Sequence, residues 1–213
     1  GKSSVARLVM RLIEPDSGRV RLGDTDLTGL KGEALRQARS RIQMVFQDPF
    51  ASLNPRRSVG RIIADGPVAH GVPLTEAMER ARRLLSLVGL DERALDRYPH
   101  EFSGGQRQRI GIARALALEP EVLVADEAVS ALDVSVQAQV LALLEDLKAR
   151  LGLSMLFITH DLRVAAQICD RIAVMRQGEI VELKTASALF SNPEHPYTRA
   201  LLDAVPGRVR QAA

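Results

Sequence analysis

Polar side chains that can bind a metal ion or move a proton follow three short apolar segments of this chain. They are Gln47 after residues 42–46, Asp126 and Glu127 after residues 122–125, and His160 two positions after residues 155–158. Short apolar runs bounded by polar residues predict buried strands. Because ligands of open α/β sheets bind at the carboxyl ends of the strands, we expect these side chains to converge on one small site.

The first residues, Gly1-Lys2-Ser3-Ser4, match the end of the phosphate-binding motif G-x-x-x-x-G-K-[ST]. In that motif the lysine, here Lys2, contacts the β- and γ-phosphates, and the next hydroxyl, Ser3, binds Mg²⁺. The helix expected to follow directs its positive end toward the anion. Asp126 supplies the carboxylate that such a metal needs as a second support. The sequence therefore predicts a nucleotide site.

A second anion site is predicted at Ser103-Gly104-Gly105-Gln106. Ser103 and Gln106 have the spacing of a capping box, which marks the beginning of a helix. Two consecutive glycines lower the helix propensity of that first turn, but they also let a phosphate approach the backbone. This second site has no lysine of its own. The pattern suggests that two chains complete one site between them.

The elements that must position these residues form an α/β core with a helical insertion. Strand–helix–strand order with short links predicts a mostly parallel sheet, accompanied by an antiparallel β portion. We assign residues 1–51 and 103–185 to the core, residues 52–102 to a helical subdomain, and residues 186–213 to a carboxyl-terminal tail.

Individual segments give sharper expectations. Asp133 is placed to cap a helix over residues 134–151, and Gly152 is placed to end it. A β-hairpin is expected to turn at Gln177-Gly178.

Within the insertion, an amphipathic helix is expected over residues 75–88. It carries Arg80, Arg82 and Arg83 on its outer side, a pattern that is typical of a solvated helix face.

Composition excludes several classes of protein. The single Cys169 excludes a disulfide framework and a cysteine zinc site within the chain, and it favours a cytosolic compartment. No apolar run approaches the roughly 18–20 residues that a spanning helix needs, so any membrane role must depend on a partner. The net charge of +3 is too small to select a partner by itself.

Five motifs occur in a characteristic order along the chain. They are GKSS at residues 1–4, QMVFQDP at 43–49, SGGQ at 103–106 with the helix after it, VLVADEAVSALD at 122–133 and ITHD at 158–161. Over essentially its whole length the chain resembles the ATP-binding subunits of ABC transporters. The resemblance implies a P-loop NTPase fold of the RecA-like type. It also implies ATP and Mg²⁺ as ligands.

In this family two nucleotide-binding domains enclose two ATP molecules head to tail. The resemblance implies roles that fall into three groups. The phosphates would be held by Gly1, Lys2, Ser3 and Ser4, and Mg²⁺ would be supported by Ser3, Gln47 and Asp126. Glu127 would be the general base, with Gln47 at the attacking water and His160 at the γ-phosphate. The ATP of the opposite subunit would be closed in by Ser103, Gly104, Gly105 and Gln106, and Asp133 would link the two sites.

Two segments narrow the resemblance further. QDPFASLNPR at residues 47–56 and NPEHPYTRALLDAVP at residues 192–206 resemble the dipeptide and oligopeptide importer ATPases. The alternatives are an importer of another substrate, such as nickel or glutathione, and an ABC ATPase that acts on nucleic acid or ribosomes. A non-catalytic regulatory copy is disfavoured, because Glu127 and His160 are both present.

The resemblance also implies partners and a location. We expect a second ATPase subunit, identical or different, a pair of membrane permease subunits, and an indirect link to a substrate-binding protein, with no nucleic acid. The subunit would lie peripherally on the cytoplasmic face of the inner membrane. The glycine-rich half of the phosphate loop does not precede Gly1, so we expect an amino-terminally truncated chain that binds and hydrolyses ATP poorly as it stands.

Overall fold

The computed structural model of the chain describes residues 1–204, with Pro49 and Phe50 described by their backbone alone. It divides into two compact units, one of residues 6–158 and one of residues 1–5 with 159–213, of which positions 205–213 lie outside the described part. The outer part of the expected tail, including Pro206, therefore falls outside the description. No helix within residues 1–204 is long and apolar enough to cross a bilayer.

The unit of residues 6–158 is built around the parallel sheet that the sequence predicts, and its strands lie in the order β3-β4-β5. Its strands are β3 (Ile42–Val45), β4 (Val122–Asp126) and β5 (Ser154–Ile158), preceded by a small antiparallel pair, β1 (Arg21–Leu22) and β2 (Thr25–Asp26). Its helices are α2 (Gly32–Ser40), α3 (Pro49–Ser52), α4 (Val59–Ala69), α5 (Leu74–Leu87), η1 (Glu92–Asp96), η2 (Pro99–Glu101), α6 (Gly104–Leu116) and α7 (Val134–Leu151).

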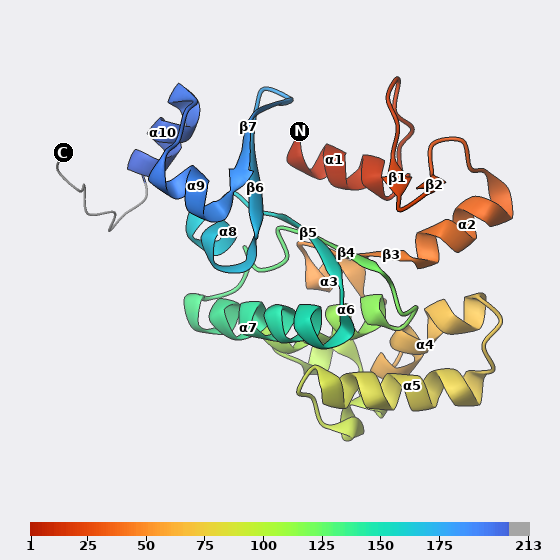
Figure 1. Ribbon diagram of the computed structural model, residues 1–213. Helices are drawn as coiled ribbons and strands as arrows, with labels where there is room; N and C mark the ends of the chain where they lie inside the picture. Colours follow the sequence, from red (N-terminus) through yellow and green to blue (C-terminus); the bar gives the residue numbers. More distant parts are fainter. Residues whose placement is uncertain (205–213) are drawn as a thin grey trace. The chain divides into compact units, whose positions relative to one another are not determined.

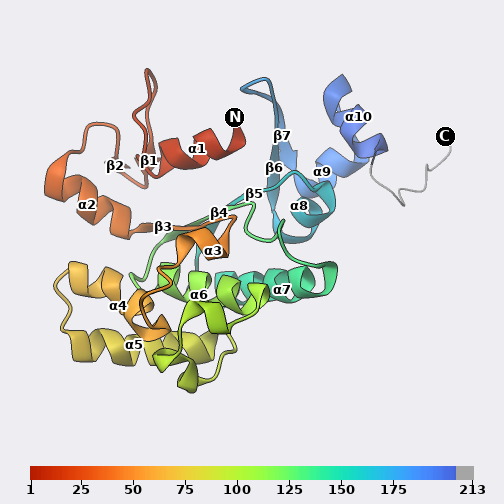
Figure 2. The ribbon, with the colours of Figure 1, turned by 180° about the vertical axis from the view of Figure 1, so that it is seen from behind.

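Successive side chains of a strand point to opposite faces of the sheet, and both faces of this sheet are buried. Ile42, Met44, Val124 and Ile158 face a cluster that includes Leu27. Val45, Leu123 and Ala125, which have the opposite parity, are also buried. Helix α6 contacts β3, α7, α4 and α5, so it joins the sheet to the α4–α5 pair (Figure 1). Seen from behind, the short helix α3 lies beside α6 (Figure 2).

The first helix is shorter than its sequence pattern predicts. The helical spacing of Val5, Leu8, Val9 and Leu12 predicts a helix over residues 4–13, whereas α1 spans Lys2–Val9. Arg11 adopts a left-handed backbone with a φ of 54°. The N–H of Leu12 donates to the carbonyl of Arg7, and the N–H of Arg11 donates to that of Leu8, which together form a Schellman motif. An arginine in the position that usually holds glycine hides this helix end from sequence reasoning.

Two other expected helix ends are confirmed. Asp133 accepts a hydrogen bond from the N–H of Val136 at 3.0 Å and caps α7, which spans the predicted residues 134–151. Gly152 follows with a left-handed φ of 63° and ends the helix.

The other unit holds an antiparallel hairpin of β6 (Arg171–Arg176) and β7 (Glu179–Thr185), which turns at the predicted Gln177-Gly178. Both turn residues have positive φ, 51° and 93°, as a tight two-residue hairpin turn requires. The other elements are α8 (Leu162–Ile168), α9 (Ala186–Ser191) and α10 (Pro196–Asp203), and α1 begins in this unit at Lys2.

Candidate functional site

The structure brings the polar tips of β3 and β4 together. The two strands pair in parallel from Ile42 with Val122 to Val45 with Ala125, so Gln47 and Glu127 leave the same edge of the sheet. The Nε2 of Gln47 donates to the Oε2 of Glu127 at 3.1 Å. A proton acceptor and an amide that can orient a water molecule are therefore in direct contact.

The backbone of Glu127 is held in an unusual conformation. Its φ is +48°, which side chains with a Cβ rarely adopt. Its N–H donates to the carbonyl of Ile158 at the tip of β5 at 2.9 Å. Its own carbonyl accepts from the N–H and the hydroxyl of Ser130, at 3.0 and 2.9 Å. These contacts fix the backbone that carries the Glu127 carboxylate. Strained residues of this kind concentrate at functional sites.

Asp126 is the last residue of β4 and is only 8% exposed. It lies beside Ile158 in the ladder, one residue before the half-buried Glu127. Together with Gln47 these side chains offer oxygen ligands, the type that Mg²⁺ prefers. No group of three or more His, Cys, Asp or Glu residues within residues 1–204 could enclose a metal ion. Two carboxylates and one amide suit a Mg²⁺ ion that is also held by substrate phosphates, as is usual for nucleotide sites.

The beginning of α6 is built as the sequence predicts. The N–H of Ser103 donates to the Oε1 of Gln106 at 3.0 Å, and the N–H of Gln106 donates back to the Ser103 hydroxyl at 3.4 Å. Ser103 and Gln106 are exposed. The positive end of α6 with its two glycines can therefore receive an anion.

Gly104 and Gly105 have different surroundings. A Cβ on Gly105 would lie 2.3 Å from the Cγ1 of Val136 in α7, so this glycine is required by packing. A Cβ on Gly104 would meet its nearest neighbour, Leu132, at an ordinary 3.6 Å. The lack of a side chain at Gly104 therefore has no packing reason, and it leaves the first turn of α6 bare.

Two arginines that sequence reasoning missed hold the surroundings of the site. Arg107 is 8% exposed, and its Nε donates to the carbonyl of Pro99 at 2.6 Å, which fixes the segment before Ser103. Arg114 donates to the carbonyl of Ser52 and lies 5.7 Å from the ring centre of Phe46, next to Gln47. Burial lowers the pKa of the Arg114 guanidinium. The available signal was their spacing of seven, which places both arginines on one face of α6.

The remaining predicted residues belong to the unit of residues 1–5 and 159–213. Lys2, Ser3 and Ser4 form the first turn of α1, where helix N–H groups are available to an anion. His160 is exposed and stands directly before Asp161, which caps α8 by accepting from the N–H of Arg163 at 2.8 Å. The side chain of Arg163 also hydrogen-bonds to Asp161 and holds the pKa of that carboxyl below its usual range.

Known families match two parts of the chain. Residues 1–130 match the family described as ABC transporter, and residues 181–212 match the one described as oligopeptide/dipeptide transporter, C-terminal region.

Among curated relatives, a Brucella ovis protein named for peptide import and ATP binding is 54% identical over 97% of this chain and 65% of its own length. The oligopeptide transport ATP-binding protein OppF of Bacillus subtilis is 51% identical over 97% of this chain and 68% of its own length. OppF of Salmonella typhimurium is 50% identical, over 97% and 62%. The chain thus spans about two thirds of the length of these relatives.

Among solved structures, proteins described as parts of ABC transporters or as ATP-binding cassettes are similar to this chain. CbiO1 of Clostridium perfringens, described as part of the ABC transporter complex cbiONQ, has a TM-score of 0.81 and 29% identity over 90% of this chain and 75% of its own. The ATP-binding cassette MJ0796, solved as a dimer bound to ADP and Pi, has a TM-score of 0.76 and 29% identity over 87% and 81%.

Proposed function

This chain belongs to the ABC transporter family, and from that premise we propose that it is the ATP-hydrolysing subunit of an importer of dipeptides or oligopeptides. The match of residues 181–212 to the carboxyl-terminal region of oligopeptide and dipeptide transporters supports this substrate class. So does the identity of 50–54% to relatives that are named for peptide import.

The observation that carries the ATPase proposal is the contact between Gln47 and Glu127 at the strand tips. A base must lie within hydrogen-bond reach of the proton that it removes, directly or through one water molecule. An amide that already holds the carboxylate at 3.1 Å can accept and donate hydrogen bonds to a water molecule beside it. We therefore assign Glu127 as the general base and Gln47 as the residue that positions the attacking water.

We assign the phosphates of ATP to the first turn of α1. Lys2 would neutralise charge on the β- and γ-phosphates, while the backbone at Gly1 and the hydroxyl of Ser4 would complete the cradle. His160 would contact the γ-phosphate and respond to its loss. The chemistry of these groups, an ammonium, a hydroxyl, an imidazole and helix N–H donors, suits a polyanion.

Mg²⁺ would be held by Ser3, Gln47 and Asp126 together with phosphate oxygens, and it supplies neutralisation of the charge that develops during phosphoryl transfer. Buried Asp126 would support the ion, in keeping with its place at the end of a strand whose neighbours fix its backbone.

The proposed reaction is an in-line displacement by water. The Glu127 carboxylate accepts a proton from the water as its oxygen forms a bond to the γ-phosphorus. The bond between that phosphorus and the bridging oxygen breaks, and ADP leaves with the electron pair. Positioning and electrostatic stabilisation supply most of the catalysis in such reactions.

Ser103, Gly104, Gly105 and Gln106 are proposed to close on the γ-phosphate of an ATP held by a second subunit, either a copy of this chain or a related one. Asp133, at the beginning of α7, would link the two sites. The packing of Gly105 against Val136 joins these two segments physically within one chain.

The proposal includes a place for the subunit at the membrane. It would bind a pair of permease subunits at the cytoplasmic face of the inner membrane, and a substrate-binding protein would act through that permease. Residues 52–102 would form the helical subdomain of this arrangement.

The test is ATP hydrolysis by the full-length protein with Glu127→Gln. General-base catalysis contributes about 10²- to 10⁴-fold, so hydrolysis is expected to fall by about that factor while ATP binding persists and an ATP-bound dimer accumulates. Glu121→Gln is the matched control, because Glu121 precedes the other end of β4 and pairs with Arg41 at 2.6 Å. Hydrolysis that Glu127→Gln leaves unchanged would refute the assignment of the base.

The substrate class is tested with the permease reconstituted in proteoliposomes. Peptide import predicts that a dipeptide with its binding protein stimulates ATP hydrolysis and accumulates inside. Stimulation by nickel or glutathione instead would replace the proposed substrate. Stimulation by RNA or ribosomes in the absence of the permease would replace transport itself.

A further inference from the structure

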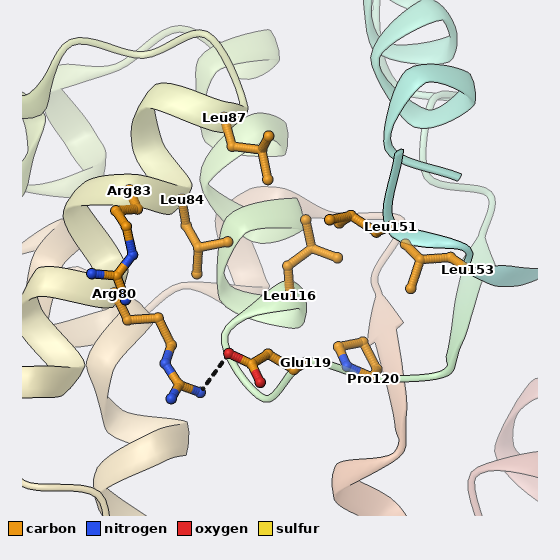
Figure 3. A pocket seen from close by; sticks show the side chains of 9 residues that line it. All are labelled: Arg80, Arg83, Leu84, Leu87, Leu116, Glu119, Pro120, Leu151 and Leu153. Carbon is orange, nitrogen blue, oxygen red and sulfur yellow. Dashed lines mark ion pairs between the residues drawn. The ribbon is translucent and has the colours of Figure 1, made fainter. Parts of the chain in front are cut away.

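A pocket of about 440 Å³ lies beside helix α5, away from the strand tips. Figure 3 shows leucine side chains directed into it from α5, α6, the last residue of α7 and the segment that joins α7 to β5. They are Leu84, Leu87, Leu116, Leu151 and Leu153. The volume falls within the range of small-molecule sites, roughly 300–1,000 Å³, which are mostly apolar with a few polar groups.

The pocket is separate from the proposed nucleotide site. Pro120 and Leu153 line it, and they precede β4 and β5. Gln47, Asp126 and Glu127 stand at the other ends of the same parallel strands. A strand of five residues spans roughly 13 Å between its first and last Cα at about 3.3 Å per residue, so one small ligand cannot occupy both places.

The two cationic residues of the pocket lie on one side, and the carboxylate of Glu119 pairs with one of them, Arg80. Arg80 and Arg83 come from α5, whereas Leu151 and Leu153 line the opposite side (Figure 3). The sequence pattern predicts that both arginines belong to a solvated face. Arg80 is instead largely buried, with 19% of its side chain exposed. A pocket that is cationic at one side and apolar at the other matches an amphipathic anion.

The two arginines differ in their existing partners. Arg80 pairs with Glu119 at 3.3 Å and with Glu76 at 3.5 Å, and it donates to the carbonyl of Ala117 at 3.0 Å. Its Nε is nevertheless buried without an acceptor within residues 1–204. Arg83 has no hydrogen bond or ion pair in that part of the chain. The uncompensated charge of the pocket is therefore that of Arg83.

We propose that this pocket binds a medium-chain alkyl carboxylate. The carboxylate pairs with the guanidinium of Arg83, whose planar fork suits two carboxylate oxygens. The alkyl chain covers the leucines and ends against Leu151 and Leu153. The carboxylate of Glu119 is already paired with Arg80, so it offers no comparable site for a cationic head group.

The test is a titration of the full-length protein, labelled with ¹³C at its leucine methyl groups, with decanoate and with decanol. Decanoate is expected to shift the methyl signals of the five pocket leucines and to bind more tightly than decanol. Octanoate and dodecanoate extend the series and measure how well the chain length matches the pocket.

Three variants separate the head group from the tail. Arg83→Gln should weaken decanoate about fivefold, as expected for a pair near the surface, and leave decanol unchanged. Arg82→Gln is the matched control, because Arg82 is the neighbouring residue of α5, is already paired with Glu92 at 2.7 Å, and does not line the pocket. Leu151→Gln, at a leucine that is 47% exposed, should weaken both ligands without unfolding the protein.

Several outcomes would overturn the proposal. The first is that decanoate does not shift the methyl signals of the pocket leucines. The second is that decanol binds as tightly as decanoate. The third is that Arg82→Gln lowers the affinity for decanoate as much as Arg83→Gln does. Because none of the variants touches the nucleotide residues, these results are independent of the outcome for Glu127.

Discussion

The two glycines at the beginning of α6, Gly104 and Gly105, have different roles. Gly105 is enclosed, and a Cβ there would meet Val136 at 2.3 Å, whereas Gly104 has room for one at 3.6 Å from Leu132. The motif in the sequence presents the two glycines as equivalent. The structure assigns packing to Gly105, which leaves Gly104 as the position where a bare backbone serves only an approaching anion.

This difference predicts that alanine at Gly105 lowers stability, whereas alanine at Gly104 impairs ATP-dependent dimer formation. Gly105→Ala should lower the free energy of unfolding by about 1–3 kcal/mol, as expected for overpacking, in urea denaturation of the protein. Gly104→Ala should leave stability within about 1 kcal/mol of the parent, because alanine favours a helix, yet it should reduce ATP-dependent dimer formation.

A double variant provides the control. Val136→Ala removes the atom that a Cβ on Gly105 would meet, so it should recover most of the stability lost in Gly105→Ala. If Gly104→Ala destabilises the protein as much as Gly105→Ala, the separation of roles is wrong.

At the scale of elements, the hairpin of the second unit is tied to the helix that ends the described chain. Glu182 of β7 has only 5% of its side chain exposed, and its two carboxylate oxygens accept from the backbone N–H groups of Glu194 and His195 at 2.8 and 3.0 Å. The ammonium of Lys184 lies 3.4 Å from the same carboxylate. A single ionised side chain thus fixes the approach to α10.

Burial acts to raise the pKa of Glu182, but the hydrogen bonds from Glu194, His195 and Lys184 act in the other direction. They outweigh burial and lower the pKa from 4.5 to about 2. Because the folded pKa lies below the unfolded value, the ionised carboxylate stabilises the fold above the unfolded pKa. That stabilisation is lost as the pH falls from about 4.5 toward 2.

Glu182→Gln should therefore destabilise the unit by about 2 kcal/mol at neutral pH, since it removes charge-assisted hydrogen bonds. Thermal unfolding of parent and variant from pH 7 to pH 3 should show this difference shrinking on the acid side. Glu179→Gln, at an exposed residue that begins the same strand, should show no such difference. A constant gap at every pH would exclude ionisation as the cause.

The elements also show how far the sequence could be read. The strands, the cap at Asp133 and the turn at Gln177-Gly178 follow from local rules, namely hydrophobic period, side-chain capping and positive φ. The end of α1 could not be predicted, because Arg11 stands where glycine usually marks a left-handed residue. Their spacing of seven places Arg107 and Arg114 on one face of α6, but it does not identify their acceptors, which are the carbonyls of Pro99 in η2 and of Ser52 in α3.

At the scale of the whole molecule, the proposed site is shared between two subunits. One subunit would contribute the phosphate loop and the base, and the other would contribute Ser103 and its glycines. A defect on either side should therefore inactivate both sites of a homodimer, but the two defects should complement each other in a mixed dimer.

Mixing Ser103→Arg and Glu127→Gln protein tests this arrangement. Each variant alone should hydrolyse little ATP, because the arginine blocks the anion site and the glutamine removes the base. A mixed dimer contains one site with both an intact Ser103 and an intact Glu127, so mixing should restore part of the activity. Activity no higher than the sum of the separate variants would show that the sites are not shared between two copies of this chain.

Glu127 has a left-handed backbone, and selection for stability alone would replace this glutamate. A side chain with a Cβ costs roughly 1–2 kcal/mol in that conformation, and glycine or asparagine would relieve it. Either replacement would also remove the carboxylate that contacts Gln47. Populations of variants screened only for thermal resistance should therefore drift away from glutamate here, while those screened for growth on imported peptides should retain it.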